Sequence, residues 1–142
     1  MSLAIKVNDL SMAYADGIEV LRGFTHSFEA GSFTAIVGPS GCGKSSLLRI
    51  LAGLQSPSSG KIETKPYTSI GYVFQEPTLL AWRTVYENVA LPLKIKGLNQ
   101  QLTHTRVVDA LALVGLADRQ HALPRELSGG MKMRVSLARA LA

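Results

Sequence analysis

The sequence predicts an α/β fold, and three consecutive features support this. A near-continuous apolar stretch, SFTAIV at residues 32–37, is typical of a strand that is buried on both faces. The glycine-rich loop GPSGCGKSS, residues 38–46, follows it directly, and a helical pattern begins inside that loop at Lys44. The order strand, loop, helix is the order found in α/β proteins.

The chain before this loop predicts an antiparallel β part. Residues 3–8 and 18–29 are expected to form short strands around a turn at Asp16-Gly17, and a second turn is expected at residues 29–31. The elements expected after the loop are a helix from Lys44 to Ala52 ended by Gly53, a turn at residues 56–60, an edge strand at 61–65 and a strand at 69–75 that ends at Gln75.

The second half of the chain predicts helices. Residues 85–96 are expected to be helical but broken by Pro92. From residue 102 to 114 apolar side chains recur at helical spacing, and Gly115 is expected to cap that helix. The periodic residues are Val107, Val108, Leu111 and Val114. A last helix is expected to begin near Ser128.

The bulk composition is that of a soluble globular protein. The 142 residues are 46% apolar and 18% charged, and no stretch approaches the ~18 apolar residues of a membrane span. The net charge is +5, but the basic residues are dispersed, which argues against a nucleic-acid partner. The single cysteine, Cys42, excludes an internal disulfide, so a reducing compartment such as the cytoplasm is favoured.

The loop matches the pattern G-x-x-x-x-G-K-[ST], which binds phosphate. Glycines let backbone N–H groups converge on a polyphosphate at the start of a helix, where the dipole favours anions. We expect Lys44 to contact the outer phosphates, Ser45 to bind Mg²⁺ and Ser46 to contact another phosphate oxygen. The expected nucleotide-binding residues of the loop are Gly38, Pro39, Ser40, Gly41, Cys42, Gly43, Lys44, Ser45 and Ser46.

The phosphate loop and two further segments, in the order that the family has them, show a resemblance to ABC ATPases that covers the whole chain. LSGGM, residues 127–131, resembles the signature motif of that family, and SIGYVFQEPTLLAWRTVYENV resembles its Q-loop with the segment that touches a membrane partner. Tyr14 stands where the family has an aromatic residue under the adenine. Within the family, the sequence is most similar to ATPases of importers for nitrate, sulfonate and taurine.

The resemblance implies roles for residues outside the loop. Ser128, Gly129, Gly130 and Met131 would act on the ATP of a partner subunit, and Gln75 would reach Mg²⁺ or a water. Simpler alternatives exist for each position. Ser128 could be an ordinary N-cap, Gln75 a solvated strand end and Tyr14 a core residue. Cys42, near a helix N-terminus, could be a thiol of lowered pKa or, more simply, a small tolerated residue.

The sequence also departs from the family pattern at three positions. Met131 and Met133 stand where glutamine is usual, and Ser46 replaces the more usual threonine. The histidines at 26, 104 and 121 have no metal-ligand spacing, so we expect them on the surface. Residues 79–89, which include Trp82, are expected to be exposed apolar surface that a permease would cover.

The resemblance further implies a complete functional setting. The chain would be a partial ABC ATPase domain, with residues 1–77 and the final helix as nucleotide-binding core and residues 78–127 as a mostly helical subdomain. It would bind ATP and Mg²⁺ and energise transport of a small solute. The implied partners are a membrane permease, a second ATP-binding subunit in a homodimer and, indirectly, a periplasmic or extracellular solute-binding protein. The implied location is the cytoplasmic face of the cell membrane.

In the family, the carboxylates of the Walker B strand and a switch histidine follow the signature helix, and neither occurs in residues 1–142. The isolated chain is therefore expected to be a fragment or a truncated product without ATPase activity, unless another acid such as Glu76 substitutes. The segments 32–37 and 69–75 are expected to have unpaired strand edges. A nucleotide-binding fragment that does not hydrolyse ATP, and a soluble ABC protein without a transport role, remain alternatives.

Overall fold

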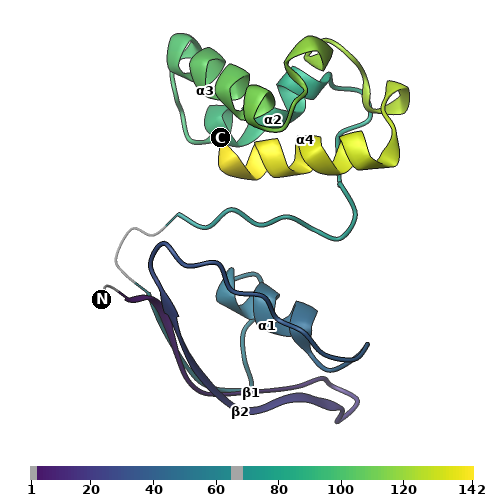
Figure 1. The fold of residues 1–142 in the computed structure, drawn as a ribbon. Coiled ribbons are helices and arrows are strands. Elements are labelled where there is room, and N and C mark those ends of the chain that lie inside the picture. Colours follow the sequence, from purple (N-terminus) through teal and green to yellow (C-terminus); the bar gives the residue numbers. More distant parts are fainter. Residues whose placement is uncertain (1–2, 65–68) are drawn as a thin grey trace. The chain divides into compact units, whose positions relative to one another are not determined.

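The computed structural model describes residues 3–64 and 69–142. The chain divides into two compact units, residues 1–70 and residues 71–142 (Figure 1). The first is built on a β-sheet and the second is helical. The predicted division into a nucleotide-binding core and a helical subdomain concerns the roles of the segments, and it stays a prediction.

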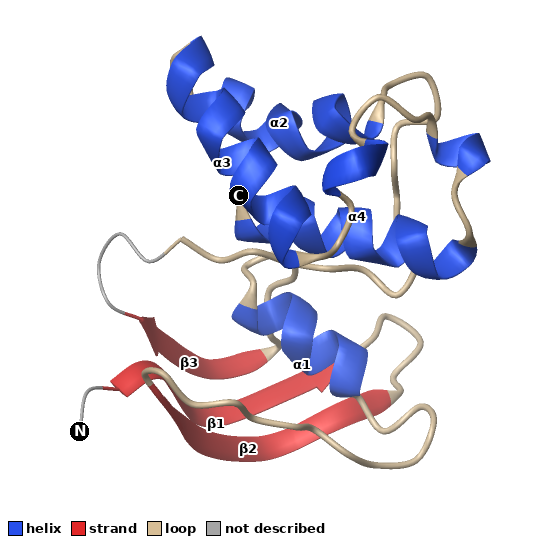
Figure 2. Cartoon of the chain, turned by 45° about the horizontal axis from the view of Figure 1, so that its top comes forward, coloured by secondary structure: helices blue, strands red, loops and turns tan. Residues whose placement is uncertain are grey.

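The first unit contains an antiparallel sheet in the strand order β2-β1-β3. Its strands are β1 (Leu3–Ala13), β2 (Glu19–Glu29) and β3 (Ser59–Thr64). Helix α1 (Lys44–Leu51) lies over one face of the sheet (Figure 2). The buried side chains between helix and sheet are Val7, Leu10, Met12, Leu47 and Ile50. The predicted hairpin, edge strand and helix are confirmed, and β1 is longer than expected.

A bulge in β1 explains how its core is assembled. Val7 and Leu10 are three positions apart, so a regular strand would point them to opposite faces. The pairing with β2 shifts by one residue between Val7 and Leu10, and the pairing with β3 shifts by one between Asn8 and Ser11. Asp9, which lies within both intervals, has a φ of 50°. The extra residue turns Leu10 back to the face of Val7, and both are fully buried.

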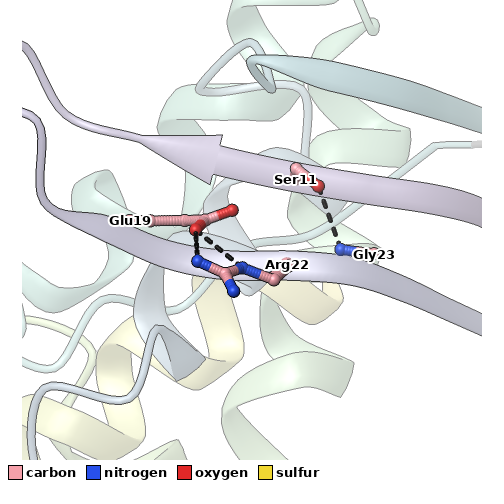
Figure 3. Close-up of polar contacts among 4 residues, drawn as sticks. All are labelled: Ser11, Glu19, Arg22 and Gly23. Carbon is pink, nitrogen blue, oxygen red and sulfur yellow. Dashed lines mark hydrogen bonds and ion pairs between the residues drawn. The ribbon is translucent and has the colours of Figure 1, made fainter.

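A second irregularity lies on β2, where the register shifts between the β1 residues Leu10 and Met12. The N–H of Gly23 donates to the side-chain oxygen of Ser11 at 2.9 Å, so a side chain replaces the missing ladder bond (Figure 3). Beside it, Arg22 Nε donates to the Glu19 carboxylate at 2.8 Å on the exposed side of the strand.

The predicted strand at residues 32–37 is wrong. Residues 33–39 have no regular secondary structure, and the side chains of Phe33 and Val37 are 96% and 89% exposed. A strand exists only when its backbone groups pair with a neighbour, and none of the described residues pairs with this segment. The segment is therefore unpaired among the described residues, and it does not form a strand.

The predicted strand at residues 69–75 is also wrong, for the same reason. Residues 69–74 have no regular secondary structure, and Gln75 lies in a bend. From Gly71 onward the segment belongs to the second unit, where it runs against the last helix. A Cβ added to Gly71 would lie 2.6 Å from the carbonyl oxygen of Ala140, so this approach requires a glycine.

The second unit consists of α2 (Val85–Ile95), α3 (Gln100–Leu113) and α4 (Gly129–Leu141), with short 3₁₀ turns at Ala117–Arg119 and Pro124–Glu126. Each helix begins at a capping side chain: Thr84, Asn99 or Ser128. The fully or nearly fully buried residues of its core are Val85, Val89, Ala90, Leu93, Val107, Ala110, Leu111, Leu116, Val135 and Ala138.

Pro92 does not break α2, contrary to prediction. The ring removes one backbone donor, yet the helix continues and the N–H of Lys96 donates to the carbonyl of Pro92 at 3.0 Å. The helix is held at its start by a capping box between Thr84 and Glu87 and by a fully buried face that includes Val89 and Leu93. Tertiary packing therefore outweighs the local cost of the proline.

Exposure in the segment 79–89 is mixed. Trp82 is 76% exposed, as predicted, but Val85 and Val89 are fully buried because they lie one turn apart on the inner face of α2. Val108, which was expected among the periodic core residues, lies on the exposed side of α3. The three histidines are exposed, as predicted.

Candidate nucleotide-binding site

The glycine-rich loop lies between residues 33–37, which have no regular secondary structure, and the start of α1. Gly41 and Gly43 have φ angles of 81° and 89°, in the left-handed region that glycine adopts most readily. At Gly43 there is also no room, because an added Cβ would lie 2.2 Å from the backbone oxygen of Val20. Strand β2 thus supports the loop from behind, and only glycine permits this approach.

The start of α1 is a concentration of backbone donors. Gly43 is the N-cap residue, and no described side chain caps this end of the helix. The first N–H groups of a helix have no acceptor within it. The first turn also contains no acidic residue. An anion placed at this end would meet free N–H groups and the positive end of the helix dipole.

The ammonium group of Lys44 is folded over the loop that precedes it. Its Nζ donates to the carbonyl oxygens of Gly38 at 2.8 Å and Pro39 at 2.6 Å, and it lies 3.5 Å from the sulfur of Cys42. Among the described residues, no carboxylate forms an ion pair with Lys44. A full positive charge that is balanced only by neutral carbonyls is well suited to a polyphosphate.

The two serines that follow Lys44 differ sharply. The side chain of Ser45 is exposed, and its hydroxyl makes no hydrogen bond to another group in the described part of the chain. Ser46 is only 5% exposed, and its hydroxyl lies 2.8 Å from the hydroxyl of Tyr14. The hydroxyl of Ser45 is therefore free to bind a cation such as Mg²⁺, while the hydroxyl of Ser46 is already hydrogen-bonded to Tyr14. The predicted phosphate contact of Ser46 stays a prediction.

Tyr14 lies at the hairpin tip that follows β1. Its side chain is 39% exposed, so it is not a core residue. Hydrogen bonding with Ser46 first, and with Gln55 second, lowers the pKa of the Tyr14 phenol, because both contacts stabilise the phenolate. No sequence pattern pointed to the contact between Tyr14 and Ser46, which are 32 positions apart. It ties the hairpin tip to the loop helix.

The signature-like residues lie at the start of α4 in the second unit. The Ser128 hydroxyl accepts the N–H of Met131 at 3.3 Å, so Ser128 is an N-cap. Gly129 and Gly130 are exposed, and a Cβ added to either would meet nothing within 4 Å. The fold of this unit therefore does not require glycine at these two positions. An external group that came close to this backbone would require it, because a side chain there would block the approach. Gln75, in the same unit, is exposed.

In residues 3–64 and 69–142, no three His, Cys, Asp or Glu side chains gather as a metal site. None of the helices described is both long enough and apolar enough to cross a membrane.

Comparison with known proteins agrees with this geometry. The ABC transporter family profile matches residues 21–142. The aliphatic sulfonates import ATP-binding protein SsuB of Pseudomonas entomophila is 45% identical over 147 aligned positions, which cover 98% of this chain and 51% of that protein. The nitrate import ATP-binding protein NrtD of a Synechocystis species is 40% identical, covering 97% of this chain and 55% of that protein. The chain thus spans about half the length of these relatives.

Solved structures show the same fold. The cbiO1 protein of Clostridium perfringens, part of an ABC transporter complex, superposes with a TM-score of 0.86 at 32% identity, covering 99% of this chain and 62% of that one. A bacterial ABC transporter cassette solved as a dimer gives a TM-score of 0.86 at 31% identity, covering 97% of this chain and 69% of that one. The phosphate-type loop, the α/β fold and the family match agree, and the chain belongs to the ABC transporter family.

Proposed function

We propose that this chain serves as the ATP-binding subunit of an ABC importer, or as part of one, and that it binds MgATP at residues 38–46. The observation that carries the proposal is the loop itself. Gly43 packs against the backbone of Val20, free N–H groups begin α1, and Lys44 has no acidic partner among the described residues. The similarity to sulfonate and nitrate import proteins supports the transport role.

The residues divide the task by chemistry. Backbone N–H groups at the start of α1 and the ammonium of Lys44 would bind the phosphates, and the hydroxyl of Ser45 would be a Mg²⁺ ligand together with Gln75. When bound, Mg²⁺ would neutralise charge on the phosphate oxygens. Tyr14 would lie against the adenine. Its contact with Ser46 would then position both the base and the phosphate end of the site.

The partners follow from the same proposal. Ser128, Gly129 and Gly130 would face a nucleotide held by a second copy, and a related cassette has been solved as a dimer. A permease would bind near Trp82, so the protein would work at the cytoplasmic face of a membrane. Residues 1–77 with the last helix would form the nucleotide-binding core and residues 78–127 the helical subdomain. ATP hydrolysis would belong to the whole protein.

Lys44→Ala tests the phosphate site. A ligand present at about 100 times its Kd stabilises the folded state by about 2.7 kcal/mol. We expect MgATP to raise the melting temperature of the parent chain and to leave that of Lys44→Ala unchanged, because the substitution removes the full positive charge that faces the phosphates. The measurement is thermal unfolding with and without MgATP.

Lys61→Ala is the matched control for this experiment. Lys61 is exposed on β3 of the same unit, and its removal changes the net charge by the same amount. The control should keep the full shift. An equal shift in Lys44→Ala would place the nucleotide elsewhere and contradict the proposal.

Substitutions at Tyr14 test the contact with the base. Stacking of a base on an aromatic ring contributes roughly 1–3 kcal/mol, so Tyr14→Ala should weaken MgATP binding about tenfold. Tyr14→Phe keeps the ring and removes the phenol hydroxyl with its hydrogen bonds to Ser46 and Gln55. Titration calorimetry with ATP and with inorganic tripolyphosphate separates the roles. If Tyr14→Ala weakens both ligands equally, Tyr14 does not contact the base.

A further inference from the structure

A short segment of the second unit is fixed by side chains from two different helices. It comprises residues 77–83, follows Gln75, ends at the N-cap of α2 and contains the exposed Trp82. We call it the Trp82 loop. It has no regular secondary structure apart from a turn in which the N–H of Arg83 donates to the carbonyl of Leu80 at 3.1 Å. Side chains must therefore supply the other bonds that hold its shape.

Arg139, in the last turn of α4, holds the beginning of the Trp82 loop. Its Nη1 donates to the carbonyl of Thr78 at 3.0 Å. Its Nη2 donates to the carbonyl of Pro77 at 3.2 Å and to the hydroxyl of Thr78 at 2.9 Å. One guanidinium group thus binds three oxygens of two adjacent residues. A lysine ammonium has no planar fork with which to copy this pattern.

Thr78 needs such a restraint because its backbone is strained. Its φ is 43°, in the left-handed region, which is rare for a β-branched residue. Conformations of this kind persist only where the surroundings enforce them. Both the carbonyl and the hydroxyl of Thr78 are bound by Arg139. The strain and the guanidinium contacts therefore occur at the same residue.

Asn88 holds the middle of the Trp82 loop from α2. Its amide is fully buried, and Oδ1 accepts the N–H of Leu80 at 2.7 Å. Its Nδ2 lies within 3.1 Å of three carbonyl oxygens. Those carbonyls belong to Leu80, Arg83 and Thr84. The loop is thus attached to α2 by one side chain and to α4 by another.

The charge of Arg139 has no carboxylate to balance it among the described residues. Burial lowers the pKa of its guanidinium, because desolvation disfavours the charged form. What compensates the charge is the set of neutral oxygens on the Trp82 loop, together with Ser136 and the negative end of the α4 dipole. Release of the loop would take away the three oxygens to which the guanidinium donates.

We propose that Arg139 is a positioning residue that fastens the Trp82 loop to α4 and holds Thr78 in its left-handed conformation. Trp82 is then presented on a preformed surface instead of a mobile one. Under the proposed function, on which this consequence rests, α4 begins at the signature residues and the loop faces the permease. Arg139 would then make the loop follow any movement of α4.

Arg139→Lys tests this in the whole 142-residue chain without nucleotide. The first readout is the one-bond Cα–Hα coupling of Thr78 by NMR, which distinguishes positive from negative φ. We expect Thr78 to leave the left-handed region in the variant. The second readout is amide hydrogen exchange of Leu80, which should accelerate at least about tenfold, as expected for loss of charge-assisted hydrogen bonds.

Arg134→Lys is the matched control. Arg134 lies on the same helix, and its Nη1 donates to the carbonyl of Val114 at 3.0 Å, away from the Trp82 loop. This control should leave both Thr78 and Leu80 unchanged. Unchanged readouts in Arg139→Lys would overturn the proposal. Equal acceleration across the core amides of α2 and α3 would also overturn it, because Arg139 would then contribute only general stability.

Thr78→Val decides the question if Arg139→Lys does not fold, because valine keeps the β-branched side chain that strains the left-handed backbone. It removes the hydroxyl acceptor and keeps both carbonyls, so Leu80 exchange should accelerate by a smaller factor, about three- to tenfold. No acceleration would overturn the proposal. Because no nucleotide is present, these results are independent of the MgATP experiment on Lys44. Either proposal can fail while the other holds.

Discussion

Asn88→Asp is expected to lower the free energy of unfolding of the helical unit by about 3–5 kcal/mol. The change preserves the shape of the side chain and removes its amide donor. Two donor hydrogens that serve three carbonyls are replaced by a carboxylate oxygen, in a site that is fully buried. The new carboxylate oxygen would face the three carbonyl oxygens, which would lose their donor, and only the N–H of Leu80 would remain to bind the charge.

Urea unfolding followed by helical circular dichroism measures this effect. The matched control is Asn99→Asp, the same chemical change at the exposed N-cap of α3, where Asn99 Oδ1 accepts the N–H of Leu102 at 2.8 Å. Aspartate caps a helix as well as asparagine does, so this control should remain within about 0.5 kcal/mol of the parent. Equal unfolding curves for the two variants would show that the Asn88 network contributes little.

Gly43→Ala is expected to abolish the stabilisation by MgATP, a loss of about 2.7 kcal/mol at 100 times Kd. A left-handed φ costs an alanine about 1–2 kcal/mol by itself. Here the added Cβ, which is fixed rigidly to the backbone, would also lie 2.2 Å from the backbone oxygen of Val20. The loop must therefore move away from β2, which displaces the N–H groups that begin α1.

Gly41→Ala separates the two causes. Gly41 has a similar φ of 81°, but a Cβ there would meet nothing within 4 Å. It should carry the conformational cost without the displacement and keep part of the MgATP stabilisation. Thermal unfolding of both variants, with and without MgATP, makes the comparison. Should both lose the stabilisation completely, the contact with Val20 would not be what decides binding.

Local signals predicted the helices well. Helices were expected from residue 85, from residue 102 and from near Ser128, and α2, α3 and α4 begin at Val85, Gln100 and Gly129. The strands at 32–37 and 69–75 were not predictable in this way, because a strand depends on a partner elsewhere in the chain. Apolar composition indicated that these segments are suited to a sheet. It could not indicate whether a neighbour is present.

In the candidate site, too, the local sequence predicted some features, and contacts between distant residues decided the others. The loop from Gly38 to Ser46 is contiguous, so its sequence pattern was sufficient to find it. The contact of Tyr14 with Ser46 and the attachment of Thr78 by Arg139 join residues 32 and 61 positions apart. Neither pair has a local signature, because the residue types are ordinary at each position. Only the packing of helix against loop brings them together.

Trp82 is the only tryptophan in the chain, and it projects into solvent from a loop that is bound on both sides. The intrinsic ultraviolet emission of an indole ring therefore originates from one defined place. A change in its wavelength, lifetime or polarisation reports on that place alone, without any attached dye. The protein thus carries its own optical sensor for the state of this surface.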